Sequence, residues 1–200
     1  MISDYASLQS AVARWAGQSS DPAFPDAVTD AISLCEARIN REVRAPEMLV
    51  RATATISSEF EALPADTLGV WAATLIDGDA EYPLRQVAPD RHAALSSQAR
   101  NYSRPNWYSA QGLQMRFQPA PGSVLAMRLL YLGKVQPLTS TVSCTAMLQA
   151  YPDLYLFGSL NFLGEYVEDS DRLSRFEARY QSAVEGANTL MVTRDGTLAA

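Results

Sequence analysis

The sequence has few of the residues that catalytic and metal-binding sites need. Its 200 residues include one histidine, His92, and two cysteines, Cys35 and Cys144. A protein zinc site takes three or four ligands, so an isolated histidine argues against a metal centre. Two cysteines form no disulfide framework, and Cys35 falls on the apolar side of a predicted helix, where a small buried hydrophobe is expected. With no Gly-rich phosphate loop and no Gly-x-Ser-x-Gly elbow, we predict no catalytic residue, bound cofactor or metal.

Positive charge and long apolar runs are also scarce. Lys and Arg number 16 against 22 Asp and Glu, which gives a net charge of −6. A general nucleic-acid binder needs a basic face to displace counterions from phosphate, so the charge argues against this class. No stretch approaches the roughly 20 apolar residues of a membrane span. The first residues lack the basic and apolar regions of a signal peptide. We therefore expect a soluble cytoplasmic product without a membrane partner.

Two amphipathic helices are predicted in the first quarter of the chain. Apolar residues recur at helical spacing over 4–16 and over 23–44. Ser3 is the expected N-cap of the first helix, and Gly17 ends it. Acidic residues open the second helix and arginines close it, which complements the helix dipole.

The middle of the chain changes to the period of β-strands. Alternating or apolar runs predict about six strands, in one antiparallel sheet or a small sandwich. Asp77-Gly78 and Gln111-Gly112 are hairpin signals, and 89–100 has the pattern of a short helix. The predicted strands are 50–57, 68–76, 82–87, 107–110, 113–117 and 124–132.

Helical spacing returns after residue 143. The segment 154–167 is apolar on nearly every side, which predicts a central buried helix. The last helix has an apolar stripe, predicted to face the core, made of Leu173, Phe176, Tyr180, Val184, Ala187 and Leu190. The fold class is therefore α+β: a helical bundle of two N-terminal and two C-terminal helices, with an inserted antiparallel β domain of about six strands. The expected divisions are 1–48 with 145–191 for the bundle, 49–144 for the β-rich insertion and 192–200 for a C-terminal tail.

A row of arginines near the end of the second helix is the main candidate site. Arg38, Arg41 and Arg44 are spaced so that their guanidinium groups form one band. An exposed face that complements the helix dipole would have the same pattern. Alternatively, the row contacts another subunit, because the guanidinium fork pairs well with carboxylates. The candidate acidic residues for the facing surface are Glu165, Glu168, Asp169 and Asp171.

Two other function classes stay open. A small hydrolase could assemble scattered Ser, Asp or Glu residues around His92, although no sequence motif supports this arrangement. Trp107 and Tyr108 could bind carbohydrate if a hairpin exposed them. We expect instead that the pair is buried in the core.

Several blocks of the chain resemble one known family in the same order. The family is that of the adaptor, or head–tail connector, proteins of tailed bacteriophages, especially short-tailed ones. The similar blocks are 5–15 (YASLQSAVARW), 31–41 (AISLCEARINR), 51–55 (RATAT), 63–66 (LPAD), 83–85 (PLR), 113–121 (LQMRFQPAP) and 151–160 (YPDLYLFGSL).

The resemblance implies a virion structural protein rather than an enzyme. Such a protein is made in the host cytoplasm and forms a ring, expected to have twelve copies, under the portal protein at the virion neck. The ring extends the DNA channel, through which the genome passes without sequence-specific binding, and it docks the next tail or nozzle component. The resemblance also suggests that the C-terminal tail, with Arg194, Asp195 and Leu198, docks onto the portal. The alternative is another neck component, such as a tail-completion or nozzle protein.

Overall fold

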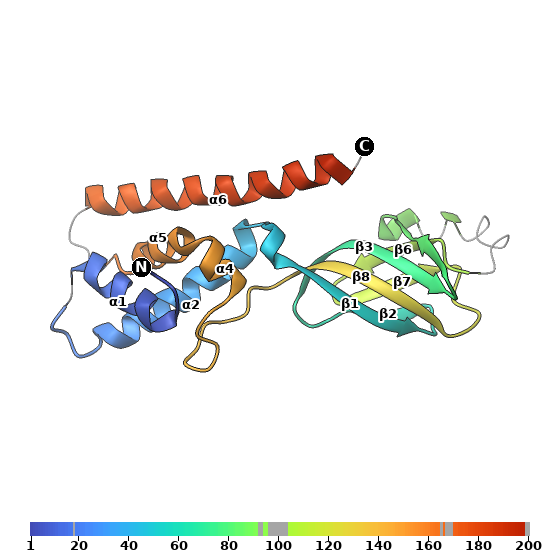
Figure 1. The fold of residues 1–200 in the computed structure, drawn as a ribbon, viewed down its shortest axis with the longest axis horizontal. Coiled ribbons are helices and arrows are strands. Elements are labelled where there is room, and N and C mark those ends of the chain that lie inside the picture. Colours follow the sequence, from blue (N-terminus) through green and yellow to red (C-terminus); the bar gives the residue numbers. More distant parts are fainter. Residues whose placement is uncertain (18, 92–93, 96–103, 165, 167–169, 199–200) are drawn as a thin grey trace. The chain divides into compact units, whose positions relative to one another are not determined.

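The protein has a mixed α+β fold. In the computed structural model, the described residues form five α-helices and two four-stranded sheets (Figure 1). The chain divides into two compact units: Met1–Met48 with Val135–Ala200, and Leu49–Lys134. Side chains of the last helix are described as far as Met191. The described residues are 1–17, 19–91, 94–95, 104–164, 166 and 170–198.

The first unit is a helical bundle organised around one buried helix. Its helices are α1 (Tyr5–Ala16), α2 (Phe24–Glu42), α4 (Ala146–Ala150), α5 (Pro152–Phe162) and α6 (Ser170–Leu198), and the turn η1 (Pro46–Met48) follows α2. The other four, α1, α2, α4 and α6, all contact α5. Leu154, Tyr155 and Leu160 of α5 are fully buried. The expectation of a central buried helix is therefore confirmed, although α5 ends at Phe162 rather than at residue 167.

A glycine allows α5 to approach both of its large neighbours closely. A Cβ placed on Gly158 would lie 2.4 Å from Cys35 Sγ of α2 and 3.0 Å from a ring carbon of Tyr180 on α6. Cys35 and Tyr180 are themselves fully buried. Only a residue without a side chain fits here, and Cys35 is the small buried residue that the sequence predicts.

The start of α1 differs from its prediction by one residue. Asp4, not Ser3, is the N-cap: its carboxylate accepts a 2.8 Å hydrogen bond from the Ser7 backbone N–H. The Ser7 hydroxyl in turn accepts a 3.0 Å bond from the Asp4 N–H, which completes a capping box. Asp4 caps because its backbone is extended, with φ −154° and ψ 174°, just before the first helical residue.

The apolar stripe of α6 is confirmed in its middle and wrong at its end. Phe176, Tyr180, Val184 and Ala187 are buried, but Leu190 is 51% exposed, and Met191 takes the core position instead. The core face continues from Ala187 by four residues rather than three, a choice that helical periodicity leaves open. The helix also extends to Leu198, so the expected tail is helical over 192–198.

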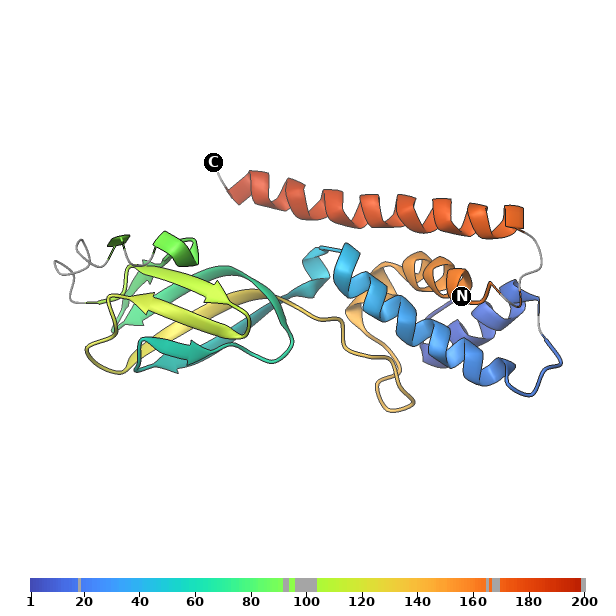
Figure 2. The ribbon, with the colours of Figure 1, turned by 180° about the vertical axis from the view of Figure 1, so that it is seen from behind.

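The second unit is a β-sandwich. One sheet has the order β1-β8-β3-β4 and the other β2-β7-β6-β5, and the two layers are visible from both sides (Figure 1 and Figure 2). Their facing side chains form one core that includes Ile56, Leu75, Met127, Tyr108 and Phe117. The strands are β1 (Leu49–Ile56), β2 (Phe60–Ala62), β3 (Thr67–Asp77), β4 (Ala80–Pro83), β5 (Arg85–Gln86), β6 (Trp107–Gln111), β7 (Gln114–Gln118) and β8 (Leu125–Gly133).

Both hairpin predictions are confirmed. The turns after β3 and β6 place Gly78 at φ 61° and Gly112 at φ 58°, the left-handed conformation that glycine adopts without strain.

The strand predicted over 82–87 is in fact two strands in different sheets. The Leu84 N–H donates to the carbonyl of Ala73, whereas the next N–H, of Arg85, donates to the carbonyl of Asn106. The chain therefore changes sheets at Leu84. Because β5 then pairs parallel with β6, the unit is not purely antiparallel. The sequence also did not predict β2 or α4, which are only three and five residues long. The short helix predicted over 89–100 begins as the turn η2 (Pro89–Arg91), and most of its remaining residues lie outside the described ones.

Candidate interaction surfaces

Arg38, the first arginine of the predicted row, links α2 to α6 inside the chain. Its two terminal nitrogens donate to the two carboxylate oxygens of Glu177 at 2.9 and 2.6 Å, and its Nε donates to Glu42 at 3.1 Å. The guanidinium group also stacks on Tyr180, 4.1 Å from the ring centroid. The hydrogen bonds from Arg38 lower the pKa of Glu177 to about 2. Bidentate pairing of this kind is stronger than an ordinary surface ion pair.

The other members of the row are exposed on α2 and just after it. The Arg44 guanidinium donates to the backbone carbonyls of Asn40 and Val43, 3.2 and 2.6 Å away, and Arg41 is exposed. The acid that Arg38 meets, Glu177, is not among those predicted. Asp171 is exposed in the first turn of α6, whereas Glu165, Glu168 and Asp169 lie outside the described residues. The role of the row in contacts between subunits stays a prediction, for which Arg41 and Arg44 are better placed than Arg38.

A buried carboxyl on α2 fixes the segment that leads from the β-sandwich into α4. Glu36, 6% exposed, accepts a 2.8 Å hydrogen bond from the Leu138 N–H. One turn later the Asn40 side chain accepts from the Val135 N–H, also at 2.8 Å. Burial raises the pKa of Glu36 to about 7. Sequence reasoning missed this site. The only sequence signal for it is that two polar residues, Glu36 and Asn40, lie four residues apart beside the buried apolar stripe of α2.

An open groove lies between α5 and α6 on the surface of the bundle. Its volume is about 600 Å³. The lining contains small residues of α6, Ala183, Gly186 and Ala187, and two charged residues, Asp153 and Arg179. The Arg179 guanidinium group stacks over the Phe157 ring, 5.2 Å from its centroid. The lining residues are Ala150, Tyr151, Asp153, Phe157, Arg179, Ser182, Ala183, Gly186, Ala187 and Leu190.

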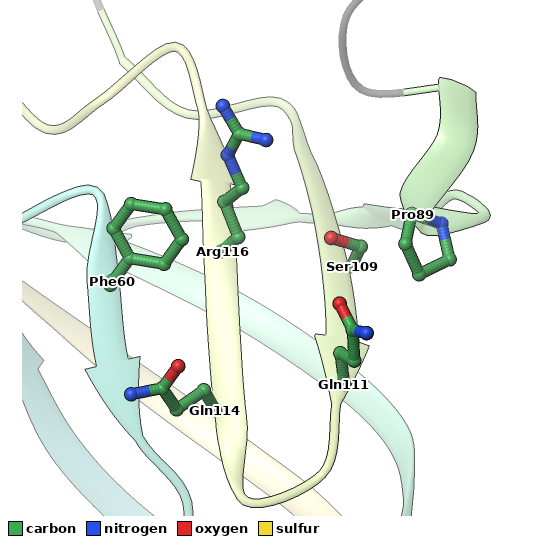
Figure 3. Close-up of a pocket in the computed structure, with 6 residues that line it drawn as sticks. All are labelled: Phe60, Pro89, Ser109, Gln111, Gln114 and Arg116. Atoms are coloured by element: carbon green, nitrogen blue, oxygen red, sulfur yellow. The ribbon is translucent and has the colours of Figure 1, made fainter.

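The outer face of the sheet formed by β2, β7, β6 and β5 has a smaller, polar pocket of about 170 Å³. Figure 3 shows Arg116 between Phe60 and Ser109, with Pro89 beyond Ser109. Phe60 is 52% exposed, and Arg116 lies 5.4 Å from its ring centroid while it donates to Glu59 at 2.7 Å. Two glutamines, Gln111 and Gln114, complete the lining.

The described residues form no site for the two other function classes, a small hydrolase and a carbohydrate-binding protein. Tyr108 is 1% exposed in the sandwich core, so Trp107 and Tyr108 do not form an exposed pair. His92 lies outside the described residues. Where the structure is described, no group of three or more His, Cys, Asp and Glu residues could hold a metal ion. Burial raises the pKa of the Cys35 thiol to about 12, which makes it unreactive at neutral pH.

None of the helices in the described part of the chain has the length and apolar character to cross a membrane.

The chain belongs to the SU10 adaptor protein family, whose sequence model matches residues 3–200. This is a family of phage adaptor proteins, so the chain has a structural adaptor role as a component of phage virions, where it interacts with other virion proteins. No curated protein matches the chain significantly.

Proposed function

We propose that this chain is the head–tail connector of its phage. Copies of the chain form a ring, expected to have twelve members, beneath the portal protein at the virion neck. The ring extends the DNA channel and docks the next tail or nozzle component. In this role the protein is not an enzyme. The family match, which covers almost the whole chain, is the observation that carries the proposal.

The division of the chain into two units supports a separation of tasks. The helical unit offers a groove and an exposed α2 face, both suited to contacts between subunits. The β-sandwich is then available for a different partner. We assign the end of α6, with Arg194, Asp195 and Leu198, to portal docking, because the resemblance to head–tail connectors implies this role for the segment. The net charge of −6 agrees with a channel that DNA passes without adhering to its wall.

Light scattering after size exclusion tests this proposal, with the chain alone and mixed with the portal protein of the same phage. The proposal predicts a complex that contains one copy of this chain for each portal subunit. A chain that does not bind the portal, but binds an isolated tail component, would instead identify another neck or tail-completion protein. A chain that binds neither would contradict the proposed role.

A further inference from the structure

The strand β1 is a long edge strand with one side unpaired in the described part of the chain. It lies at one end of the sheet β1-β8-β3-β4. Its eight residues pair with β8 without a register shift, from Leu49 opposite Leu132 to Ile56 opposite Leu125. Among the described residues, no backbone–backbone hydrogen bond outside the β1–β8 ladder involves residues 49–56. The second side of β1 is therefore a row of free backbone donors and acceptors.

The register identifies which backbone groups of β1 are free. The Leu84 N–H donates to the Ala73 carbonyl, so Ala73 of β3 directs its backbone groups toward β4 and away from β8. Leu129, which lies opposite Ala73 in β8, therefore directs its groups toward β1, where it pairs with Ala52. Because the direction alternates along a strand, every second residue of β1 directs its N–H and C=O groups to the free edge. These residues are Leu49, Arg51, Thr53 and Thr55.

The other three edges of the described sandwich are short. The edge strands β2, β4 and β5 have three, four and two residues, and β4 ends in Pro83. Short edge strands and prolines are two ways in which proteins prevent a sheet from pairing with another chain. The edge strand β1 has neither protection: it is regular over eight residues, contains no proline and carries one charge, Arg51. This contrast indicates that β1 is left open for another strand.

The core-facing side of β1 is open as well. Ile56 is buried in the sandwich core, so Val50, Ala52 and Ala54, which alternate with it, are on the same side of the sheet. Val50 is nevertheless 37% exposed, and Ala54 is exposed. The apolar surface thus continues to the free edge. A strand that paired with β1 would extend the core if every second side chain were apolar and the others polar.

We propose that β1 is the docking strand for the next tail or nozzle component, which adds an extended segment to the sheet β1-β8-β3-β4. The free edge specifies an extended segment, because the backbone of a β-strand matches a row of alternating N–H and C=O groups. The segment has alternating apolar and polar side chains, with the apolar ones beside Val50 and Ala54. This inference rests on the proposed function, because it names the surface through which the tail component is docked.

A second copy of the chain is a poorer match for this edge. Pairing of β1 with the β1 strand of another copy is isologous and joins only two copies, whereas a ring needs a heterologous contact. The other edge strands of the described sandwich match at most half the length of β1. The portal is assigned above to the end of α6, which belongs to the helical unit. The tail or nozzle component is therefore the partner that we assign to β1.

Amide hydrogen exchange at single-residue resolution tests this docking strand. It is measured on the chain alone, on its complex with the portal, and on that complex after the purified tail or nozzle component of the same phage is added. We expect the tail component to slow exchange at Arg51, Thr53 and Thr55 by about tenfold or more. The amides of Ala52 and Ala54, already bonded to β8, should be protected in every state. Side-chain contact alone would not produce this alternation.

Proline substitution provides an independent readout. Thr53→Pro removes an N–H that points to the free edge and no bond of the β1–β8 ladder, a position where edge strands tolerate proline. The variant should bind the tail component about tenfold more weakly and bind the portal as the wild type does. Thr53→Ala is the matched control: it keeps the N–H and should bind both partners normally. The exchange measurement uses the wild-type chain, so it stands even if the proline variant does not fold.

The outcomes separate this inference from the proposed function. If the chain binds the tail component without slower exchange at Arg51, Thr53 and Thr55, or if folded Thr53→Pro binds it normally, the docking strand is wrong and the adaptor role stands. Protection of these amides on the portal before the tail component is added would show that the portal or a second copy covers β1, and it would also overturn the inference. If the wild-type chain binds neither partner, the proposed function fails and this inference fails with it.

Discussion

Replacement of Gly158 by alanine tests how closely the central helix packs against its neighbours. The new Cβ would lie 2.4 Å from Cys35 Sγ and 3.0 Å from the Tyr180 ring. Non-bonded heavy atoms are best separated by about 3.5–4.0 Å and repel at shorter distances, so the sulfur would have to move by about 1 Å. It has little room to do so, because the thiol donates to the carbonyls of Leu154 and Tyr155, at 3.5 and 3.7 Å, in a fully buried site.

Two effects of opposite sign determine how much Gly158→Ala changes the free energy of unfolding. Alanine in a helix interior is favoured over glycine by about 1 kcal/mol. Overpacking of a tight core costs about 1–3 kcal/mol, and here two neighbours are affected. We therefore expect Gly158→Ala to lower the free energy of unfolding by about 1–2 kcal/mol. Gly186→Ala is the matched control: it is also a helical glycine, but a Cβ there meets nothing within 4 Å, so a gain of about 0.5–1 kcal/mol is expected.

Urea unfolding followed by ellipticity at 222 nm measures both variants, since the described α-helices all belong to the helical unit. A second test adds Cys35→Ala to Gly158→Ala. Removal of the sulfur relieves the closer of the two contacts, so the combined loss should be smaller than the sum of the single losses. Gly158→Ala with stability equal to or above that of the wild type would refute the close packing of α5 against α2.

Three further changes test individual interactions. Glu177→Gln should lower the free energy of unfolding by about 1 kcal/mol at pH 7, since the pair with Arg38 is partly exposed. Because the folded-state pKa of Glu177 is about 2, the wild type should lose this contribution as the pH falls from 4.5 toward 2. A variant whose free energy of unfolding changes with pH in the same way over this range would contradict the pairing. For Glu36 the pH dependence of stability has the opposite sign, because its pKa rises from 4.5 to about 7 on folding. In urea titrations the free energy of unfolding of the wild type should fall by about 2 kcal/mol between pH 5 and pH 8. The Glu36→Gln variant should not show this loss, and equal pH profiles would contradict the burial. Asp4→Ala should cost about 1 kcal/mol in thermal unfolding and Ser3→Ala almost nothing, whereas the reverse order would restore Ser3 as the cap.

The first two helices could be predicted well from the sequence, because an apolar stripe at helical spacing has few alternatives. The limits of α1 and α2 are within two residues of their predictions. Two of the errors occur where two neighbouring residues are equally suitable. Leu190 and Met191 are both large and apolar, and which of them faces the core depends on how α6 lies on α5. Ser3 and Asp4 are both good caps, and the backbone conformation decides between them.

The contacts made by the candidate residues could not be predicted from the sequence. Arg38 meets Glu177, a residue 139 positions away, and no local pattern indicates such a pair. The change of sheet at Leu84 was hidden for the same reason, since alternation reveals which side chains are buried but not which strand is the partner. Sequence reasoning could therefore place Arg41 and Arg44 on an exposed surface, but it could not recognise that Arg38 holds α2 to α6.

Reconstitution of tail attachment tests the adaptor role most directly. Particles made by a phage in which this gene carries a stop codon are purified, and the purified chain is added back. The account predicts DNA-filled heads without tails, to which tails attach and infectivity returns once the chain is added. Particles that acquire complete tails without this chain would contradict the central claim.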